Sequence, residues 1–238
     1  MSKRAPNAEA SPWRIAALAR FYRGIVAPGD LAFDVGAHAG NRTRALLGAG
    51  ARVVALEPQW LFHAFLRRDL PAAVTLLPLA AGRAPGRATL AVSRLHPTVS
   101  SLADGFAERM RAAPGFERVA WDAADTVEVT TLDALIAEHG LPRFIKLDVE
   151  GAEAEVLAGL AQPVPWIAFE SLPANPAATE ACLDRLAALG RYRFNLVEGE
   201  RDGFALDRWP DRSGIAATLA ARPRDDRPAD VYARLDAG

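Results

Sequence analysis

The stretch Leu31–Thr43, LAFDVGAHAGNRT, decides how the N-terminal part of this chain folds. It opens with an apolar run that is typical of a buried parallel strand, and Asp34 follows that run. Gly36 and Gly40 come next, before the helix-compatible sequence RTRALLGAG. This order predicts a strand, a tight glycine turn and the N-terminus of a helix. Glycines let backbone amides approach a ligand closely, and a helix N-terminus favours a carboxylate or phosphate.

A second acid supports a nucleotide-binding unit. Glu57 follows the apolar run 52–56 and therefore lies at the tip of the second predicted strand, where nucleotide folds hold a ribose hydroxyl pair. The glycines do not follow the dinucleotide pattern GxGxxG. Their spacing, D-x-G-x-x-x-G, is nearer to the S-adenosylmethionine pattern of Rossmann-like methyltransferases. An ordinary turn that merely uses glycine remains the alternative at this point.

Composition bounds the class of protein. Half of the 238 residues are hydrophobic, which is enough for one sizeable core, and the net charge of −1 does not suggest a nucleic-acid partner. A single cysteine, Cys182, excludes an internal disulfide and a cysteine-cluster metal site. Apolar runs stay below about 18 residues and no secretory signal is visible, so we expect no membrane span and a cytoplasmic protein.

The pattern along the chain predicts one domain over 1–238, with an N-terminal helical extension at 1–30 and an insertion on the substrate side at 83–130. The fold class that we expect is α/β, with a doubly wound, mostly parallel sheet, an antiparallel closing strand and an inserted β/loop segment. Beyond the first unit, strands are expected at 74–80, 87–93, 126–130, 144–149, 166–170, 192–197 and 203–206, and helices at 13–23, 60–68, 134–139, 152–160 and 179–189.

Acids gather at the predicted strand ends. Open α/β sheets bind ligands beyond the carboxyl ends of their strands, so four acids there suggest a cationic or hydroxyl-rich ligand. These acids are Asp34, Glu57, Asp148 and Glu170. Strand alternation in FIKLDVEG would give Lys146, Asp148 and Glu150 one common orientation. A lysine inside an apolar strand needs a partner, and we expect Lys146 to be buried and paired with Glu170 or Asp34.

Several motifs occur in a defined order along the chain. They are DVGAHAGNRT at 34–43, the pair Glu57-Pro58, the serines Ser100-Ser101, TTLDALI at 130–136 and IKLDVEGAEAEVLAGL at 145–160. In this order they resemble the FkbM-type methyltransferase family, whose fold is similar to class I S-adenosylmethionine-dependent methyltransferases. The resemblance implies S-adenosyl-L-methionine as cofactor and a hydroxyl oxygen as the usual methyl acceptor.

The resemblance also implies roles for individual residues. It places the amino-acid end of the cofactor on Asp34, Gly36, Ala37, His38, Gly40 and Thr43. Glu57 would hold the ribose, Pro58 would shape the adenine side, and Asp148 would lie beside the transferring methyl. The family usually has asparagine where this chain has His38, so the contact at this position differs.

A hydroxyl acceptor must lose a proton, so a general base is expected. The candidates are Asp148, Glu150, His38 and His96, and Ser100 and Ser101 either bind the acceptor or cap a turn. No metal is expected, because a catechol-type magnesium site would want an adjacent acid–asparagine pair. The favoured function is methyl transfer to a small hydroxylated metabolite or sugar, with a non-catalytic binding or scaffold subunit and an NAD-dependent oxidoreductase as alternatives. The sequence does not identify the acceptor or the oligomeric state, and it does not decide whether oxygen or nitrogen is the nucleophile.

Overall fold

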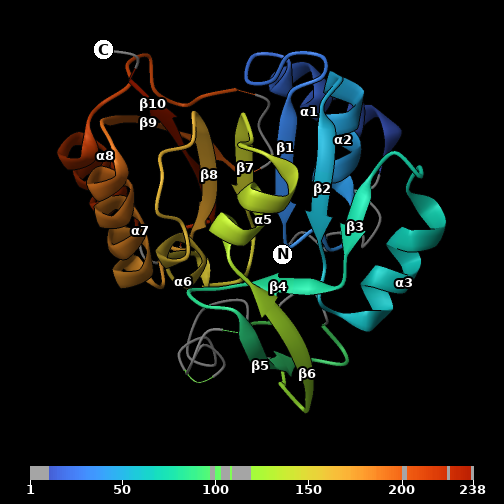
Figure 1. The fold of residues 1–238 in the computed structure, drawn as a ribbon. Coiled ribbons are helices and arrows are strands. Elements are labelled where there is room, and N and C mark those ends of the chain that lie inside the picture. The colour runs from blue at the N-terminus through green and yellow to red at the C-terminus, as the bar shows by residue number, and fades with distance from the viewer. Residues whose placement is uncertain are drawn as a thin grey trace.

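A mostly parallel sheet forms the centre of the computed structural model, which describes residues 11–96, 100–102, 108, 119–199, 203–223 and 226–236. Within these residues the sheet has seven strands in the order β3-β2-β1-β7-β8-β10-β9 (Figure 1). They are β1 Leu31–Val35, β2 Arg52–Leu56, β3 Thr75–Leu77, β7 Phe144–Leu147, β8 Trp166–Ser171, β9 Tyr192–Glu198 and β10 Ala229–Leu235. Only β10 runs antiparallel to its neighbours in this part of the chain, which confirms the predicted doubly wound sheet with an antiparallel closing strand.

Helices cover both faces of this sheet. One face packs against α1 Pro12–Tyr22, α2 Asn41–Ala49 and α3 Trp60–Asp69. The other packs against α5 Leu132–His139, α6 Glu153–Ala158, α7 Pro176–Leu189 and α8 Arg212–Ala220. Alternation along β1 explains the two cores, because Phe33 lies in one and Ala32 in the other. The predicted cap at Thr131 is confirmed, since its side chain accepts a hydrogen bond from the Ala134 N–H at 3.1 Å.

A small second sheet lies beyond the carboxyl ends of β1 and β2 (Figure 1). It consists of β4 Leu79–Ala81, β6 Ala123–Thr130 and β5 Gly86–Val92, in that order. The strands predicted at 87–93 and 126–130 are therefore present. The single strand predicted at 74–80 is wrong, because the chain passes from the main sheet to the second sheet at Pro78, which has no backbone N–H to continue a ladder.

The C-terminal part departs most from expectation. A strand at 203–206 is wrong: the Asn195 side chain accepts from the Leu206 N–H at 3.0 Å and donates to the Leu206 carbonyl at 2.9 Å, which replaces strand pairing there. The closing strand is instead β10, whose alternating sequence ADVYARL was not recognised as a strand. Helix α8 was also missed.

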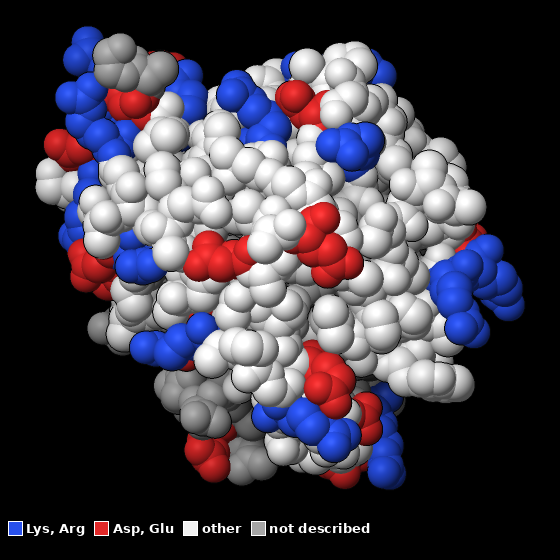
Figure 2. Space-filling view, in the orientation of Figure 1, with Lys and Arg blue, Asp and Glu red and all other residues white. Residues whose placement is uncertain are grey.

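Charge is spread unevenly over the face that Figure 2 shows. Lys and Arg side chains lie mainly towards the rim of that face, and acidic side chains occur both near its middle and along its left and lower edges. None of the helices in the described ranges has the length and apolar character needed to cross a bilayer.

Candidate active site

The turn after β1 is built from left-handed residues. Gly36, His38 and Gly40 have φ values of 86°, 47° and 78°, and the N–H groups of Gly36 and Ala37 donate to the Leu56 carbonyl at 3.0 and 2.9 Å. A Cβ added to Gly36 would lie 2.0 Å from the Asp148 carbonyl oxygen. Glycine is therefore required there, because the turn after β7 passes directly against it.

Glu57 lies under the same turn. Its carboxylate accepts hydrogen bonds from the His38 N–H at 2.7 Å and from the Gln59 N–H at 2.8 Å, and the residue is 3% exposed. Burial raises the pKa of Glu57 to about 7, although the two backbone N–H groups act to lower it. Pro58, which follows it, is partly buried. Glu57 therefore fixes the left-handed conformation at His38 in this structure.

Asp34 is buried beneath the helix that follows the turn. Its Oδ2 accepts a 2.5 Å hydrogen bond from the Thr43 hydroxyl, and neither residue is exposed. Burial raises the pKa of Asp34, and the Thr43 hydroxyl counteracts this. Asp34 and Thr43 thus join the end of β1 to the first turn of α2, and their contact with a cofactor stays a prediction.

The turn after β7 is also left-handed, and its backbone N–H groups donate to a different buried glutamate. β7 ends at Leu147, and the chain then adopts φ values of 52° at Glu150 and 92° at Gly151. Glu153 accepts from the Val149 N–H at 3.1 Å and the Gly151 N–H at 3.3 Å, and burial raises its pKa to about 7. The strand alternation expected over 146–150 does not continue past Leu147, because the left-handed turn replaces the strand there.

Lys146 is fully buried, as predicted, but its expected partners are wrong. Its ammonium group lies 3.0 Å from Asp230 Oδ1 and 3.5 Å from Asp148 Oδ2, and it donates to the Leu147 carbonyl at 2.8 Å. Burial lowers the pKa of Lys146, but the carboxylates of Asp148 and Asp230 outweigh it and hold that pKa above its ordinary value. Asp230 belongs to β10, the strand that sequence reasoning did not find.

Arg42 joins the two turns. Its guanidinium lies 3.1 Å from Asp230 Oδ2 and 3.9 Å from Asp148 Oδ2. Because Arg42 is in the first turn of α2, this contact links the glycine turn to the end of β7. Asp148 itself keeps a side-chain exposure of 29%, so its carboxylate remains accessible at the edge between the turns.

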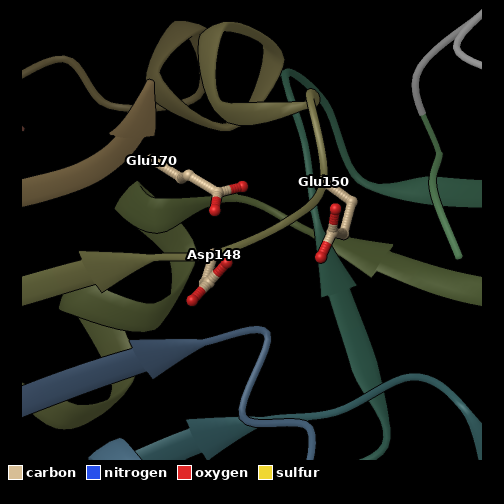
Figure 3. Close-up of side chains that lie close together, drawn as sticks. All are labelled: Asp148, Glu150 and Glu170. Carbon is tan, nitrogen blue, oxygen red and sulfur yellow. The ribbon is translucent and has the colours of Figure 1, made fainter. Parts of the chain in front are cut away.

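Three of the predicted residues come together in space. Oxygen atoms from Asp148, Glu150 and Glu170 all lie within 4.8 Å of one another, and the side chains point toward a common space (Figure 3). Burial, followed by the charge of Asp148, raises the pKa of both Glu150 and Glu170 well above the ordinary glutamate value. Glu170 was expected at a strand end, and it lies in β8 beside β7.

The loop after β5 reaches the same edge. The Ser101 hydroxyl donates to the Glu150 carbonyl at 2.7 Å, and the Ser100 hydroxyl lies 3.2 Å from Gln59 Oε1. The Ser101 contact supports the turn at Glu150, whereas the Ser100 contact joins two side chains and favours neither of the two roles. His96 is partly buried and its N–H donates to the Ser93 hydroxyl at 3.2 Å, but its ring is not part of the carboxylate group. Residues 97–99, 103–107 and 109–118 of the predicted insertion lie outside the described residues.

The parallel sheet, the glycine turn and the acids at the strand ends define a Rossmann-like class I methyltransferase. The family model of the methyltransferase FkbM domain matches residues 34–210, and the chain belongs to this family. Its cofactor is S-adenosyl-L-methionine.

Solved structures show likenesses in fold. The O-methyltransferase from Bacillus cereus in complex with SAH is 11% identical, with a TM-score of 0.48, and the match covers 95% of this chain and 82% of that one. The precorrin-6y C5,15-methyltransferase from Geobacter metallireducens is also 11% identical, with a TM-score of 0.44, over 94% of this chain and 86% of that one. No curated protein matches the chain.

The residues present fit this cofactor. Helix α2 begins after Gly40, an N-cap residue without a side chain, so its first-turn N–H groups face a place where an anionic carboxylate is favourable. The partly exposed carboxylate of Asp148 lies across Gly36 from that helix and suits a sulfonium cation. The carboxylate and the sulfonium of the cofactor thus have complementary groups at this edge of the sheet.

Proposed function

We propose that this methyltransferase transfers the methyl group of S-adenosylmethionine to a hydroxyl oxygen of a small molecule. The observation that supports this most is the group of carboxylates at Asp148, Glu150 and Glu170, beside the glycine turn. Carboxylates accept hydrogen bonds from hydroxyl groups and can take their protons, which are the two things that an oxygen nucleophile needs.

The cofactor would lie across the turn after β1. Its carboxylate would be held by the backbone of Ala37–Gly40 and the start of α2, its ribose by Glu57, and its adenine beside Pro58. When bound, S-adenosylmethionine supplies an activated methyl group on a sulfonium centre. What the chain itself contributes is position and exclusion of water around the acceptor.

Asp148 would face the acceptor. Lys146 and Arg42 hold its side chain in place, since both cations lie within 4.0 Å of Oδ2. A carboxylate there can stabilise the positive charge shared by the sulfonium and the transferring methyl group, or accept the hydroxyl proton. Glu150, with its raised pKa, and His96, in the loop after β5, are the other groups proposed to receive that proton.

A screen for product would test the proposal. Purified protein is incubated with S-adenosylmethionine and a panel of sugars, hydroxy acids, phenols and amines, and products are identified by mass spectrometry. We expect an O-methylated small molecule. Methylation only at nitrogen or carbon would contradict the proposed acceptor. Binding of S-adenosylhomocysteine without turnover on any acceptor class would instead favour the scaffold alternative.

Asp148→Asn then tests the role of the carboxylate, because it keeps the shape and removes the charge. If Asp148 acts on the acceptor, turnover should fall by about 10²–10⁴ while cofactor affinity changes little. If Asp148 acts only on the cofactor, affinity should fall and turnover should recover at saturating cofactor. Glu155→Gln, at an exposed ion pair of α6 with Arg83, is the control and should leave both parameters unchanged.

A further inference from the structure

Three carboxylates form a cluster at the ends of β7 and β8. Asp148 and Glu150 come from the turn after β7, and Glu170 comes from the neighbouring strand β8. One oxygen atom from each lies within 4.8 Å of the other two. Figure 3 shows the three side chains facing one space, two from the turn after β7 and one from β8.

Glu170 supplies the second observation. Its Oε2 atom is shielded from solvent and has no hydrogen-bond partner among the described residues, although the residue as a whole is only partly buried. This carboxylate points toward Asp148 and Glu150 (Figure 3). A buried carboxylate oxygen without a hydrogen bond is costly, so a positively charged ligand would stabilise it.

The nearby cations do not supply that charge. Lys146 and Arg42 make their ion pairs with Asp148 and Asp230. No ion pair within 4.0 Å joins a described Lys, Arg or His to Glu150 or Glu170. When they are ionised, the two glutamates therefore add negative charge that no direct ion pair in the described part of the chain balances, although the charge of Lys146 offsets part of it.

The fold holds Glu150 in this position at a cost. A non-glycine residue with φ near 52° is uncommon, and here the conformation is supported from two sides. Ser101 donates to the Glu150 carbonyl, and Glu153 accepts the N–H groups on either side of Glu150. The turn thereby places a carboxylate oxygen of Glu150 within 4.8 Å of oxygens of Asp148 and Glu170.

We propose that Asp148, Glu150 and Glu170 bind a divalent cation that prefers oxygen ligands, such as Mg²⁺, Mn²⁺ or Ca²⁺. Carboxylates suit these ions, and two oxygens on opposite sides of such an ion lie about 4–5 Å apart, in keeping with the observed spacing. The sequence argued against a metal because no acid–asparagine pair follows the strand. The third ligand comes instead from Glu150, through the left-handed turn.

A cation at this position would also serve the proposed function. It would bind the oxygen of the acceptor and lower the pKa of its hydroxyl group, which eases proton loss before methyl transfer. This consequence rests on the proposed methyl transfer, whereas the cation site itself does not.

Calorimetric titration of the full chain with MnCl₂, MgCl₂ and CaCl₂, without cofactor or acceptor, tests the site. We expect one ion per chain for at least one of these metals, with a Kd at or below about 1 mM. Glu150→Gln and Glu170→Gln should each weaken binding at least about tenfold. The control Glu155→Gln, an exposed acid of the neighbouring helix, should bind like wild type.

Circular dichroism would verify the fold of each variant. If Glu170→Gln does not fold, the result for Glu150→Gln, a substitution on the turn, decides the test. No binding of any of the three ions, or equal binding by wild type and both variants, would overturn the site. Titration of the same samples with S-adenosylhomocysteine separates the two proposals. Cofactor binding without metal binding refutes only the cation site.

Discussion

The turns after β1 and β7 are built alike and present opposite chemistry. Each uses left-handed residues, at Gly36–Gly40 in one and at Glu150–Gly151 in the other. Each is fixed by a buried glutamate, Glu57 or Glu153, that accepts two backbone N–H groups and whose pKa is raised to about 7. The same local device therefore recurs at two neighbouring strand ends.

What differs is where the carboxylates of each turn lie. At the first turn Asp34 is buried and hydrogen-bonded to Thr43, so its carboxylate does not face a ligand. The backbone amides and the start of α2 remain available there, and these groups suit an anion. In the second turn Asp148 and Glu150 lie at the edge with Glu170, which suits a cation or a hydroxyl group. We propose that the turn after β1 binds the cofactor and that the turn after β7 faces the acceptor.

Removing the Lys146 ammonium group, behind the turn after β7, should have the largest effect on stability. Lys146→Ala removes the buried one of the two cations that pair with Asp230 and Asp148 and leaves Arg42 to balance both, which should destabilise the protein by about 3–5 kcal/mol in urea unfolding. Adding Asp230→Asn should recover at least about 1 kcal/mol, because Arg42 then has one carboxylate to balance instead of two. A single variant that unfolds like wild type would show that Lys146 does not hold this turn.

The contact between the two turns is tested by Gly36→Ala. The new Cβ would meet the Asp148 carbonyl in a left-handed backbone, so we expect a loss of about 2–4 kcal/mol in stability. Gly29→Ala is a matched control, since Gly29 has φ 89° but open space around it, and it should cost about 1 kcal/mol. Equal costs at both positions would refute the close approach as the cause.

Glu57 tests whether the first turn serves the cofactor. Glu57→Gln keeps one accepting oxygen and removes the charge, so calorimetry should show S-adenosylmethionine binding weakened by about 1.5–3 kcal/mol. The fold should persist, because the amide oxygen can still accept from one of the two N–H groups. Unchanged affinity in a folded variant would remove Glu57 from the cofactor site.

Replacing Glu153 should have the smallest effect, and the raised pKa of Glu153 fixes the sign of the pH dependence of stability. Its folded pKa of about 7 lies above the ordinary 4.5, so the folded protein holds an extra proton between these values and loses stability as pH rises through them. Glu153→Gln cannot titrate, so its stability relative to wild type should rise by about 1–2 kcal/mol from pH about 6 to about 8. Parallel unfolding curves across that range would contradict the assigned pKa.

Local sequence predicted the first turn better than the second. The apolar run, the glycines and Glu57 carry their own signals, and so does the cap at Thr131. Glu150 was misread because strand alternation was extended past Leu147, and a left-handed turn at a non-glycine residue leaves little trace in sequence. The partner of Lys146 was missed because Asp230 is distant in the chain and reaches it only through the antiparallel pairing of β10 with β8.

A crystal structure with S-adenosylhomocysteine tests the division between the turns most directly. The account predicts that the homocysteine carboxylate lies against Ala37–Gly40 and the start of α2, that the ribose lies beside Glu57, and that the sulfur faces Asp148. A cofactor bound elsewhere, or one whose sulfur points away from Asp148 and the carboxylates beside it, would contradict the account.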